Sequence, residues 1–256
     1  MIDLNHRSAF VYGRAIGAPA PPGARINTLI DDALVAEREG QRPRDYLGAS
    51  RIGEPCARRL VYEITHMPPD PGSELEGRSL RIFAAGHVFE DLAISWLRKA
   101  GFDLRTHTRT GGQFGFETAG GRIRGHVDGV IVSGPDIGLT WPALWEHKAL
   151  KASSWSDTAK RGVQLSKPVY YAQMQIYMAY MGLGCGLLTA LNKDTCELFH
   201  EPVALDPGAA QALSDRAVDV LRAADAGELP ARIAVRPDFY LCRFCPYAAR
   251  CWEATA

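Results

Sequence analysis

The chain has 256 residues, of which 46% are hydrophobic and 23% are charged, as in ordinary soluble globular proteins. Twenty-nine basic residues balance 29 acidic ones, so the net charge gives no evidence of nucleic-acid binding, and any such contact must come from a local basic patch. No signal-peptide pattern opens the chain, and its most apolar stretch, 178–191, is shorter than the ~20 residues of a membrane span, so we expect a cytoplasmic protein without membrane association.

The chain divides into an N-terminal extension over 1–46 and one domain over 47–256. Within the extension, the run 18–23 predicts a turn or linker, and 26–39 predicts a short helix. A longer helix is predicted over 79–100, because apolar residues recur there at spacings of three and four: Leu80, Phe83, Ala84, Val88, Leu92 and Trp96. Gly101 is typical of the residue just past a helix end.

Strand patterns follow over 122–132 and 143–150, on either side of a turn-rich segment. A helix is predicted over 168–181, then strands over 185–191 and 197–205. Asp206 and Pro207 favour the start of another helix, ending near 226. The tail from 236 onward is dominated by cysteines and aromatic residues, and the whole order indicates a mixed α/β fold.

Carboxylates and a lysine recur on the two strand patterns at 122–132 and 143–150. Glu146 and Lys148 are two residues apart, so their side chains share one face of a strand and His147 points to the other. If the two strands pair, Asp128 can lie beside Glu146. Two carboxylates can bind Mg²⁺ or Mn²⁺, and the lysine can orient attacking water and offset charge on a phosphate.

A single E-x-K sequence is more often a solvent-facing ion pair on a strand. Here the Ala, Leu and Trp residues around Glu146 and Lys148 indicate a largely buried strand. Charged residues are seldom fully buried unless they are paired or functional. The context therefore favours the functional interpretation.

Asp128 in G-x-x-D, Glu146 and Lys148 in E-x-K, and Gln173 and Tyr177 in Q-x-x-x-Y occur in this order. The set resembles the RecB-like branch of the PD-(D/E)XK nucleases. The resemblance implies a restriction-endonuclease-like core, with a mixed central sheet flanked by helices, and implies that the first three residues are catalytic. It also implies that Gln173 and Tyr177, which share a helix face, help hold DNA at the mouth of the site. A core-packed Tyr177 with Gln173 at its rim is the alternative.

The same family carries a histidine on the helix before its first catalytic strand. His87, in AAGHVFEDLA, fits that position. The resemblance implies that it binds the divalent metal ion with Asp128 and Glu146. Otherwise, a histidine in an apolar stripe is more often a hydrogen-bonded core residue. His126 and His147 match no position in the family.

Cys242, Cys245 and Cys251 form C-x2-C-x5-C, and Cys56 stands alone far upstream. In a cytoplasmic protein such cysteines favour metal binding over disulfides. The arrangement resembles the iron–sulfur nucleases, among them AddB and the CRISPR-associated exonucleases. The resemblance implies a 4Fe-4S cluster on four thiolates that joins the two ends of the core.

Two other uses of these four cysteines remain open. They could form a zinc site, although the lack of a second C-x2-C favours iron–sulfur, or they could be simply buried. Cys185 and Cys196 lie in strand-like segments and are expected in the core.

Four basic residues lie between Lys148 and Gln173 against one acidic residue: Lys151, Lys160, Arg161 and Lys167. Aromatic residues are interleaved with them. Such a run is usually a solvated loop, but its position predicts contact with DNA, in particular for Lys151, Lys160 and Arg161.

Together these features predict a Mg²⁺- or Mn²⁺-dependent DNA exonuclease acting on single strands or duplex ends, in phage or bacterial recombination, repair or CRISPR adaptation. No G-x-x-x-x-G-K-S/T loop is present, so any helicase or CRISPR partner would be another protein. The alternative is a catalytically silent nucleic-acid-binding subunit, against which the intact Asp, Glu and Lys set argues. An electron carrier is disfavoured, because ferredoxins concentrate their cluster ligands locally.

Overall fold

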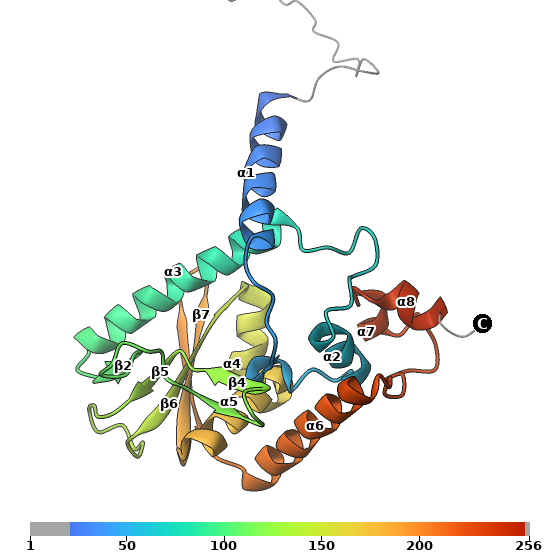
Figure 1. Cartoon of the computed structure of the whole chain (residues 1–256). Helices are drawn as coiled ribbons and strands as arrows, with labels where there is room; N and C mark the ends of the chain where they lie inside the picture. The colour runs from blue at the N-terminus through green and yellow to red at the C-terminus, as the bar shows by residue number, and fades with distance from the viewer. Residues whose placement is uncertain (1–20, 254–256) are drawn as a thin grey trace, which may run out of the picture.

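The computed structural model describes residues 21–253, which form a mixed α/β fold (Figure 1). The strands are β1 (Leu47–Gly48), β2 (Leu104–Arg105), β3 (Gly115–Thr118), β4 (Ile123–His126), β5 (Gly129–Ile131), β6 (Ala143–Leu150), β7 (Cys185–Asn192) and β8 (Leu198–Ala204). The helices are α1 (Pro22–Glu39), the 3-10 turn η1 (Ala49–Arg51), α2 (Ala57–Ile64), α3 (Gly77–Lys99), α4 (Ala152–Ser166), α5 (Pro168–Met181), α6 (Pro207–Ala226), α7 (Tyr240–Arg243) and α8 (Ala248–Glu253).

The main sheet has five strands in the order β2-β5-β6-β7-β8. Only β6 and β7 run parallel, with Glu146 opposite Leu188, and the other three neighbouring pairs are antiparallel. Strands β6 and β7 are almost wholly buried, as expected where helices cover both faces of a sheet. A smaller sheet, β1-β4-β3, lies beside it.

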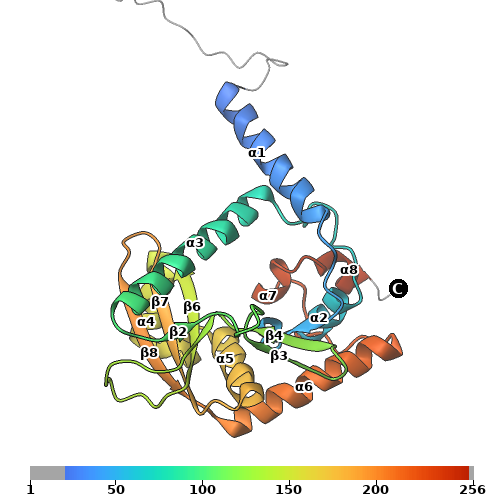
Figure 2. The same cartoon turned by 60° about the vertical axis from the view of Figure 1, so that its left-hand side comes forward.

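Helices cover the two faces of the main sheet (Figures 1 and 2). Helix α3 crosses one face, where Ile94 and Leu97 pack with Trp145 and Leu187. Helices α4 and α5 cover the other face, and α6 packs against α5 and α2. The sheet is therefore held between layers that bring α3 and α5 to the same strand, β6.

The predicted helix over 79–100 is confirmed as α3, but its apolar stripe is only partly buried. Phe83, Val88 and Leu92 remain exposed, whereas Ala93, Ile94 and Leu97 face the sheet. The face of a helix that meets a sheet depends on its docking angle, which periodicity alone does not determine.

Other predicted elements match closely. The helix at 168–181 is α5, the strand at 143–150 is β6, and the two later strands are β7 and β8 within one or two residues. Asp206 caps α6, because its carboxylate accepts a hydrogen bond from Ala209 N at 2.9 Å. The predicted helix at 26–39 is α1, although it already begins at Pro22, so 22–23 are helical rather than part of a linker.

The predicted strand over 122–132 is wrong as a single element. The chain leaves the small sheet after His126 and enters the main sheet at Gly129, so β4 and β5 belong to different sheets. Helices α2 and α4 were not predicted. Helix α4 contains Gly162 at φ 74°, a kink that interrupts its periodicity.

The C-terminal segment is fastened to the connection between α2 and α3. Asp70 N donates to Pro246 O at 2.7 Å, and the Asp70 carboxylate accepts from Ala249 N at 2.7 Å and Arg250 N at 3.2 Å. Tyr62 packs against Tyr247 with ring centroids 5.1 Å apart. Across 21–253, no helix has the length and apolar character needed to cross a membrane.

Candidate active site

The break between β4 and β5 positions the first acidic residue. Gly129 pairs with Trp145 in an antiparallel register, so the preceding residue, Asp128, lies across from Glu146. Asp128 Oδ2 accepts a hydrogen bond from His147 N at 2.8 Å. The two carboxylates thus meet at the point where the chain changes sheets.

Glu146 lies at the centre of this group, and its side chain has no solvent exposure. Its Oε1 accepts hydrogen bonds from Lys148 Nζ and, at 2.7 Å, from Gln173 Nε2. Its Oε2 is buried and has no hydrogen-bond partner within the described chain. A buried carboxylate oxygen without a donor is costly unless a cation meets it, so the donor set fits a hard divalent metal ion.

Burial, followed by the charge of Asp128, raises the pKa of Glu146 to about 8. Lys148 opposes this shift with its positive charge. The two carboxylates raise the pKa of Lys148 despite its own burial, so the lysine stays charged. Lys148 Nζ also lies 5.1 Å from the centre of the Tyr170 ring. The site therefore gathers acidic groups whose burial and mutual repulsion favour protonation, beside one fixed cation.

Glu90 on α3 is a third acidic residue of this group, and the sequence analysis missed it. Burial, then Asp128, raises its pKa, and it also interacts electrostatically with Glu146. His87, by contrast, has an 80% exposed side chain whose Nδ1 lies 3.7 Å from Glu90 Oε2. The spacing of three residues between His87 and Glu90 puts both on one side of α3, and this spacing could have indicated Glu90 as a site residue.

The expected contact of Gln173 and Tyr177 with DNA does not match their positions. Both side chains are buried, and Gln173 Nε2 contacts Tyr177 Oη at 3.2 Å as well as Glu146. Tyr177 belongs to the main core and packs edge-on against Phe116. The α5 face that carries them meets β6, so they reach the Glu146 carboxylate rather than the molecular surface.

The three basic residues predicted to contact DNA are exposed, but they do not lie together. Lys151 directly follows β6 and occupies the N-cap position of α4, without a capping hydrogen bond from its side chain. Lys160 and Arg161 lie more than two turns further along α4, and Arg161 pairs with Asp157 at 3.3 Å. Lys151 is therefore the one nearest in sequence to Lys148.

The remaining histidines and cysteines are distributed as follows. His147 points away from Glu146 and stacks on Trp145, whereas His126 is exposed. Cys185 is half-buried and donates to Thr140 O at 3.1 Å. The expectation that Cys196 is a core residue is wrong, because it lies exposed in the turn between β7 and β8 at φ 63°.

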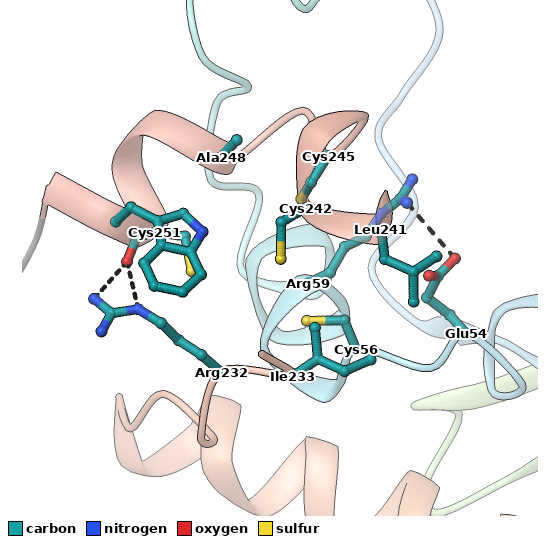
Figure 3. Close-up of a pocket in the computed structure, with 11 residues that line it drawn as sticks. Glu54, Cys56, Arg59, Arg232, Ile233, Leu241, Cys242, Cys245, Ala248 and Cys251 are labelled. Carbon is teal, nitrogen blue, oxygen red and sulfur yellow. Dashed lines mark hydrogen bonds and ion pairs between the residues drawn. The ribbon is translucent and has the colours of Figure 1, made fainter. Parts of the chain in front are cut away.

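The four cysteines from the two ends of the domain line one small cavity (Figure 3). Cys56 lies just before α2, and Cys242, Cys245 and Cys251 come from α7, its end and α8. Leu241 and Trp252 also line the cavity. Residues 56 and 242 are thus brought together by the fold, as the sequence resemblance implies.

Arginine side chains lie beside this cysteine site. Arg58 Nη1 lies 3.7 Å from Cys251 Sγ, and Arg59 lines the cavity, where it pairs with Glu54 at 3.6 Å. Burial first, and the neighbouring thiol of Cys56 among the further causes, raises the pKa of Cys242 and of Cys245. Four soft thiol ligands with guanidinium groups beside them fit a bound metal centre, because such a centre would draw negative thiolates into one place.

As the side chains stand in residues 21–253, no group of three or more His, Cys, Asp and Glu residues is arranged to hold a metal ion. Metal binding at either the acidic or the cysteine site would therefore require local movement of side chains.

Comparison with known proteins identifies the fold. No family model and no curated protein matches the sequence. The chain is similar to the alkaline exonuclease LHK-Exo from Laribacter hongkongensis, at 15% identity and a TM-score of 0.52 over 77% of this chain and 93% of that one. LHK-Exo in complex with dAMP gives 16% identity and a TM-score of 0.51, over 72% of this chain and 89% of that one. SSO0001 gives 16% identity and a TM-score of 0.49, over 90% and 98%. At these identities the two LHK-Exo matches establish a shared fold and nothing further.

Proposed function

We propose that this protein is a Mg²⁺- or Mn²⁺-dependent PD-(D/E)XK nuclease that hydrolyses phosphodiester bonds in DNA. The observation that carries the proposal is the buried, unpartnered Oε2 of Glu146, with Asp128 and Lys148 beside it. Most buried carboxylate oxygens in proteins have a donor, so this one needs an explanation, and a metal ion would supply it. The fold shared with an alkaline exonuclease supports the proposal and favours exonuclease activity.

Each residue has a defined role in this proposal. Asp128, Glu146 and Glu90 supply oxygen ligands, and His87 is a further candidate ligand at their edge. The bound metal ion would lower the pKa of a water molecule and polarise the phosphate. Lys148 would orient the attacking water and stabilise the developing negative charge. Gln173 would hold Glu146 in place through its 2.7 Å hydrogen bond.

The decisive experiment incubates the purified full chain with end-labelled single-stranded and duplex DNA, with Mn²⁺, with Mg²⁺ and with EDTA. We expect cleavage with either metal ion and none with EDTA. The silent-subunit alternative predicts DNA binding without any cleavage under all three conditions, which would reject the nuclease assignment.

We also propose that Cys56, Cys242, Cys245 and Cys251 hold a 4Fe-4S cluster that joins the two ends of the domain. Support comes from the common cavity that they line and from the arginines around it. The cluster would be structural, because nothing in the hydrolysis of a phosphodiester requires electron transfer. Recombination, repair or CRISPR adaptation, with a separate helicase or CRISPR partner protein, is the setting we favour for such an enzyme.

A further inference from the structure

Helix α5 contacts both charged residues of the E-x-K sequence on β6. Gln173 Nε2 donates to Glu146 Oε1 at 2.7 Å, and the centre of the Tyr170 ring lies 5.1 Å from Lys148 Nζ. Tyr170 and Gln173 are three residues apart, so their side chains lie on one side of the helix. One side of α5 therefore reaches the carboxylate and the lysine of the same strand.

The ammonium group of Lys148 is only partly fixed by the carboxylate. Its side chain is 21% exposed, and within residues 21–253 it forms one ion pair, with Glu146. The accepting oxygen, Oε1, is shared with Gln173. A lysine ammonium is a point charge on a flexible four-carbon stem, so a single hydrogen bond leaves its position loosely defined. A second contact would restrict it.

The ring of Tyr170 is itself held by the start of α5. Pro168 begins this helix, and Tyr170 N donates to Lys167 O at 2.9 Å. The ring is half-buried and packs against the main hydrophobic core. An ammonium within about 6 Å of the centre of an aromatic face is attracted to it by a cation–π interaction. The core therefore restricts the ring, and the ring can restrict the lysine.

We propose that Tyr170 is a positioning residue for Lys148, and that its ring holds the ammonium where the lysine can orient the attacking water. The inference rests on the proposed nuclease function and adds one residue to it. The face of the ring provides the contact, and the hydroxyl is not required. Loss of the ring leaves Lys148 charged but mobile, so cleavage slows while the affinity for DNA is unchanged.

Single-turnover cleavage of end-labelled DNA with Mn²⁺, over a range of enzyme concentrations, separates the maximal rate from the half-saturating concentration. Loss of a cation–π contact at a partly buried site corresponds to a factor of about 5 to 30. We expect Tyr170→Leu to lower the maximal rate by this factor and to leave the half-saturating concentration unchanged. Tyr170→Phe keeps the ring and should cleave at the wild-type rate.

Tyr171→Leu is the matched control for these variants. Tyr171 occupies the next position of α5 and is also half-buried, but it interacts with Asp206 rather than with Lys148. Its replacement removes the same groups from the same helix, so it should leave the maximal rate unchanged. Thermal unfolding of both leucine variants checks that they are folded. If Tyr170→Leu does not fold, Tyr170→Met takes its place, because a flexible methionine fills an irregular gap.

A double-mutant cycle tests whether Tyr170 acts through Lys148. If it does, Tyr170→Leu should have no further effect once Lys148→Ala is present. The double variant should then cleave as slowly as Lys148→Ala alone. A full additional loss in the double variant would overturn the inference, because the ring would then act on another group.

Nuclear magnetic resonance of protein labelled at lysine gives a signal that does not depend on activity. The ε-methylene protons of a lysine held over a ring resonate upfield of the ordinary lysine range. We expect this shift in wild type and in Tyr170→Phe, and its loss in Tyr170→Leu. Absence of the signal from Lys148→Ala assigns it. An ordinary lysine shift in the wild-type protein would overturn the inference.

The remaining outcomes separate this inference from the nuclease assignment. Equal losses of rate in Tyr170→Leu and Tyr170→Phe would overturn the role of the ring and indicate the hydroxyl. A change confined to the half-saturating concentration would overturn it as well, and would make Tyr170 a DNA contact. Both results leave the nuclease assignment intact. Wild-type protein that cuts no DNA with either metal ion would overturn both proposals.

Discussion

Gln173 Nε2 donates a 2.7 Å hydrogen bond to Glu146 Oε1, so a residue of α5 fixes the carboxylate presented by β6. The two residues are 27 positions apart, and the bond is buried. It shares Oε1 with Lys148, which leaves Oε2 as the oxygen without a hydrogen-bond partner in the described chain. The geometry of the site is thus set by two elements of the fold, β6 and α5, rather than by one strand.

Glu146→Gln and Lys148→Ala should each lower the cleavage rate by at least about 100-fold, the scale observed when one preorganised charged or hydrogen-bonding group is removed. Glu146→Gln should leave the melting temperature near or above that of wild type, because burial already penalises the charged carboxylate. Single-turnover cleavage and thermal unfolding measure the two effects. Lys151→Ala is the control for the loss of a lysine. If Lys148→Ala cleaves DNA as fast as Lys151→Ala does, the assignment of Lys148 is wrong.

Gln173→Ala should lower kcat with little change in KM, because its side chain contacts Glu146 and is buried away from solvent. The free energy of unfolding should fall by about 1–3 kcal/mol, as when a buried hydrogen-bonding group loses its partner. Steady-state kinetics and denaturant titration test this, with the exposed Gln164→Ala as control. If KM rose strongly and kcat did not change, the result would instead support direct contact between Gln173 and DNA.

Glu90→Gln should raise the Mn²⁺ concentration that gives half-maximal cleavage by about tenfold or more, consistent with loss of an oxygen ligand. His87→Ala should have the smaller effect, because the histidine is mostly exposed. Asp91→Asn, at the next position of α3, controls for the loss of one negative charge. If His87→Ala raised the required Mn²⁺ concentration more than Glu90→Gln did, the histidine would be the principal metal ligand on α3.

Protein purified without oxygen should be brown and contain iron and acid-labile sulfide near four each per chain. Cys56→Ser and Cys251→Ser should lose the colour, whereas the exposed Cys196→Ser should keep it. Closing a loop of 242 minus 56, or 186 residues, contributes on the order of 5 kcal/mol in the chain-entropy account of a cross-link, so the colourless variants should also unfold far more readily. If the wild-type protein is colourless and holds one zinc ion, the four cysteines bind zinc rather than an iron–sulfur cluster.

His147 should make folding sensitive to mild acid. Burial, with Lys148 nearby, lowers its pKa from 6.5 in the unfolded chain to about 4. The unfolded state therefore takes up the proton first, and stability present above pH 6.5 is lost as the pH falls towards 4. Between pH 7 and 5 the loss is about 2 kcal/mol.

Denaturant unfolding in EDTA at both pH values tests this for wild type and His147→Phe, which keeps a ring against Trp145. All other groups titrate in both proteins, so the difference isolates His147. Equal losses in the two proteins would contradict the shifted pKa.

The sequence predicted those helices and strands whose own residues carry a clear apolar pattern or cap. Helix α5 and strand β6 have long apolar runs, and α6 has a clear cap, so their positions could be predicted within one or two residues. The break at Val127 and Asp128 could not be predicted from the sequence. Both β4 and β5 have strand character, and only the tertiary structure assigns them to different sheets. Helix α4 was not predicted, because Gly162 interrupts its helical periodicity.

Within the site, spacing along the strands indicated Asp128, Glu146 and Lys148 as neighbours, and the register brings them together. Glu90 could not be identified in this way, since α3 reaches the carboxylates only through its packing on the sheet. The burial of Gln173 likewise depends on which face of α5 meets β6. These relationships arise from contacts between elements rather than from the pattern within any one of them.

The Asp70 contacts with Pro246, Ala249 and Arg250 also join segments of the chain that are synthesised far apart in time. The cysteine cavity has one wall from residues near 56 and the other from residues near the C-terminus. A ribosome makes the second wall at least 186 residues after Cys56, and contacts so distant in sequence form late in folding. A centre held by all four cysteines could therefore form only after residue 251 has been synthesised, and until then Cys56 lacks its three partners.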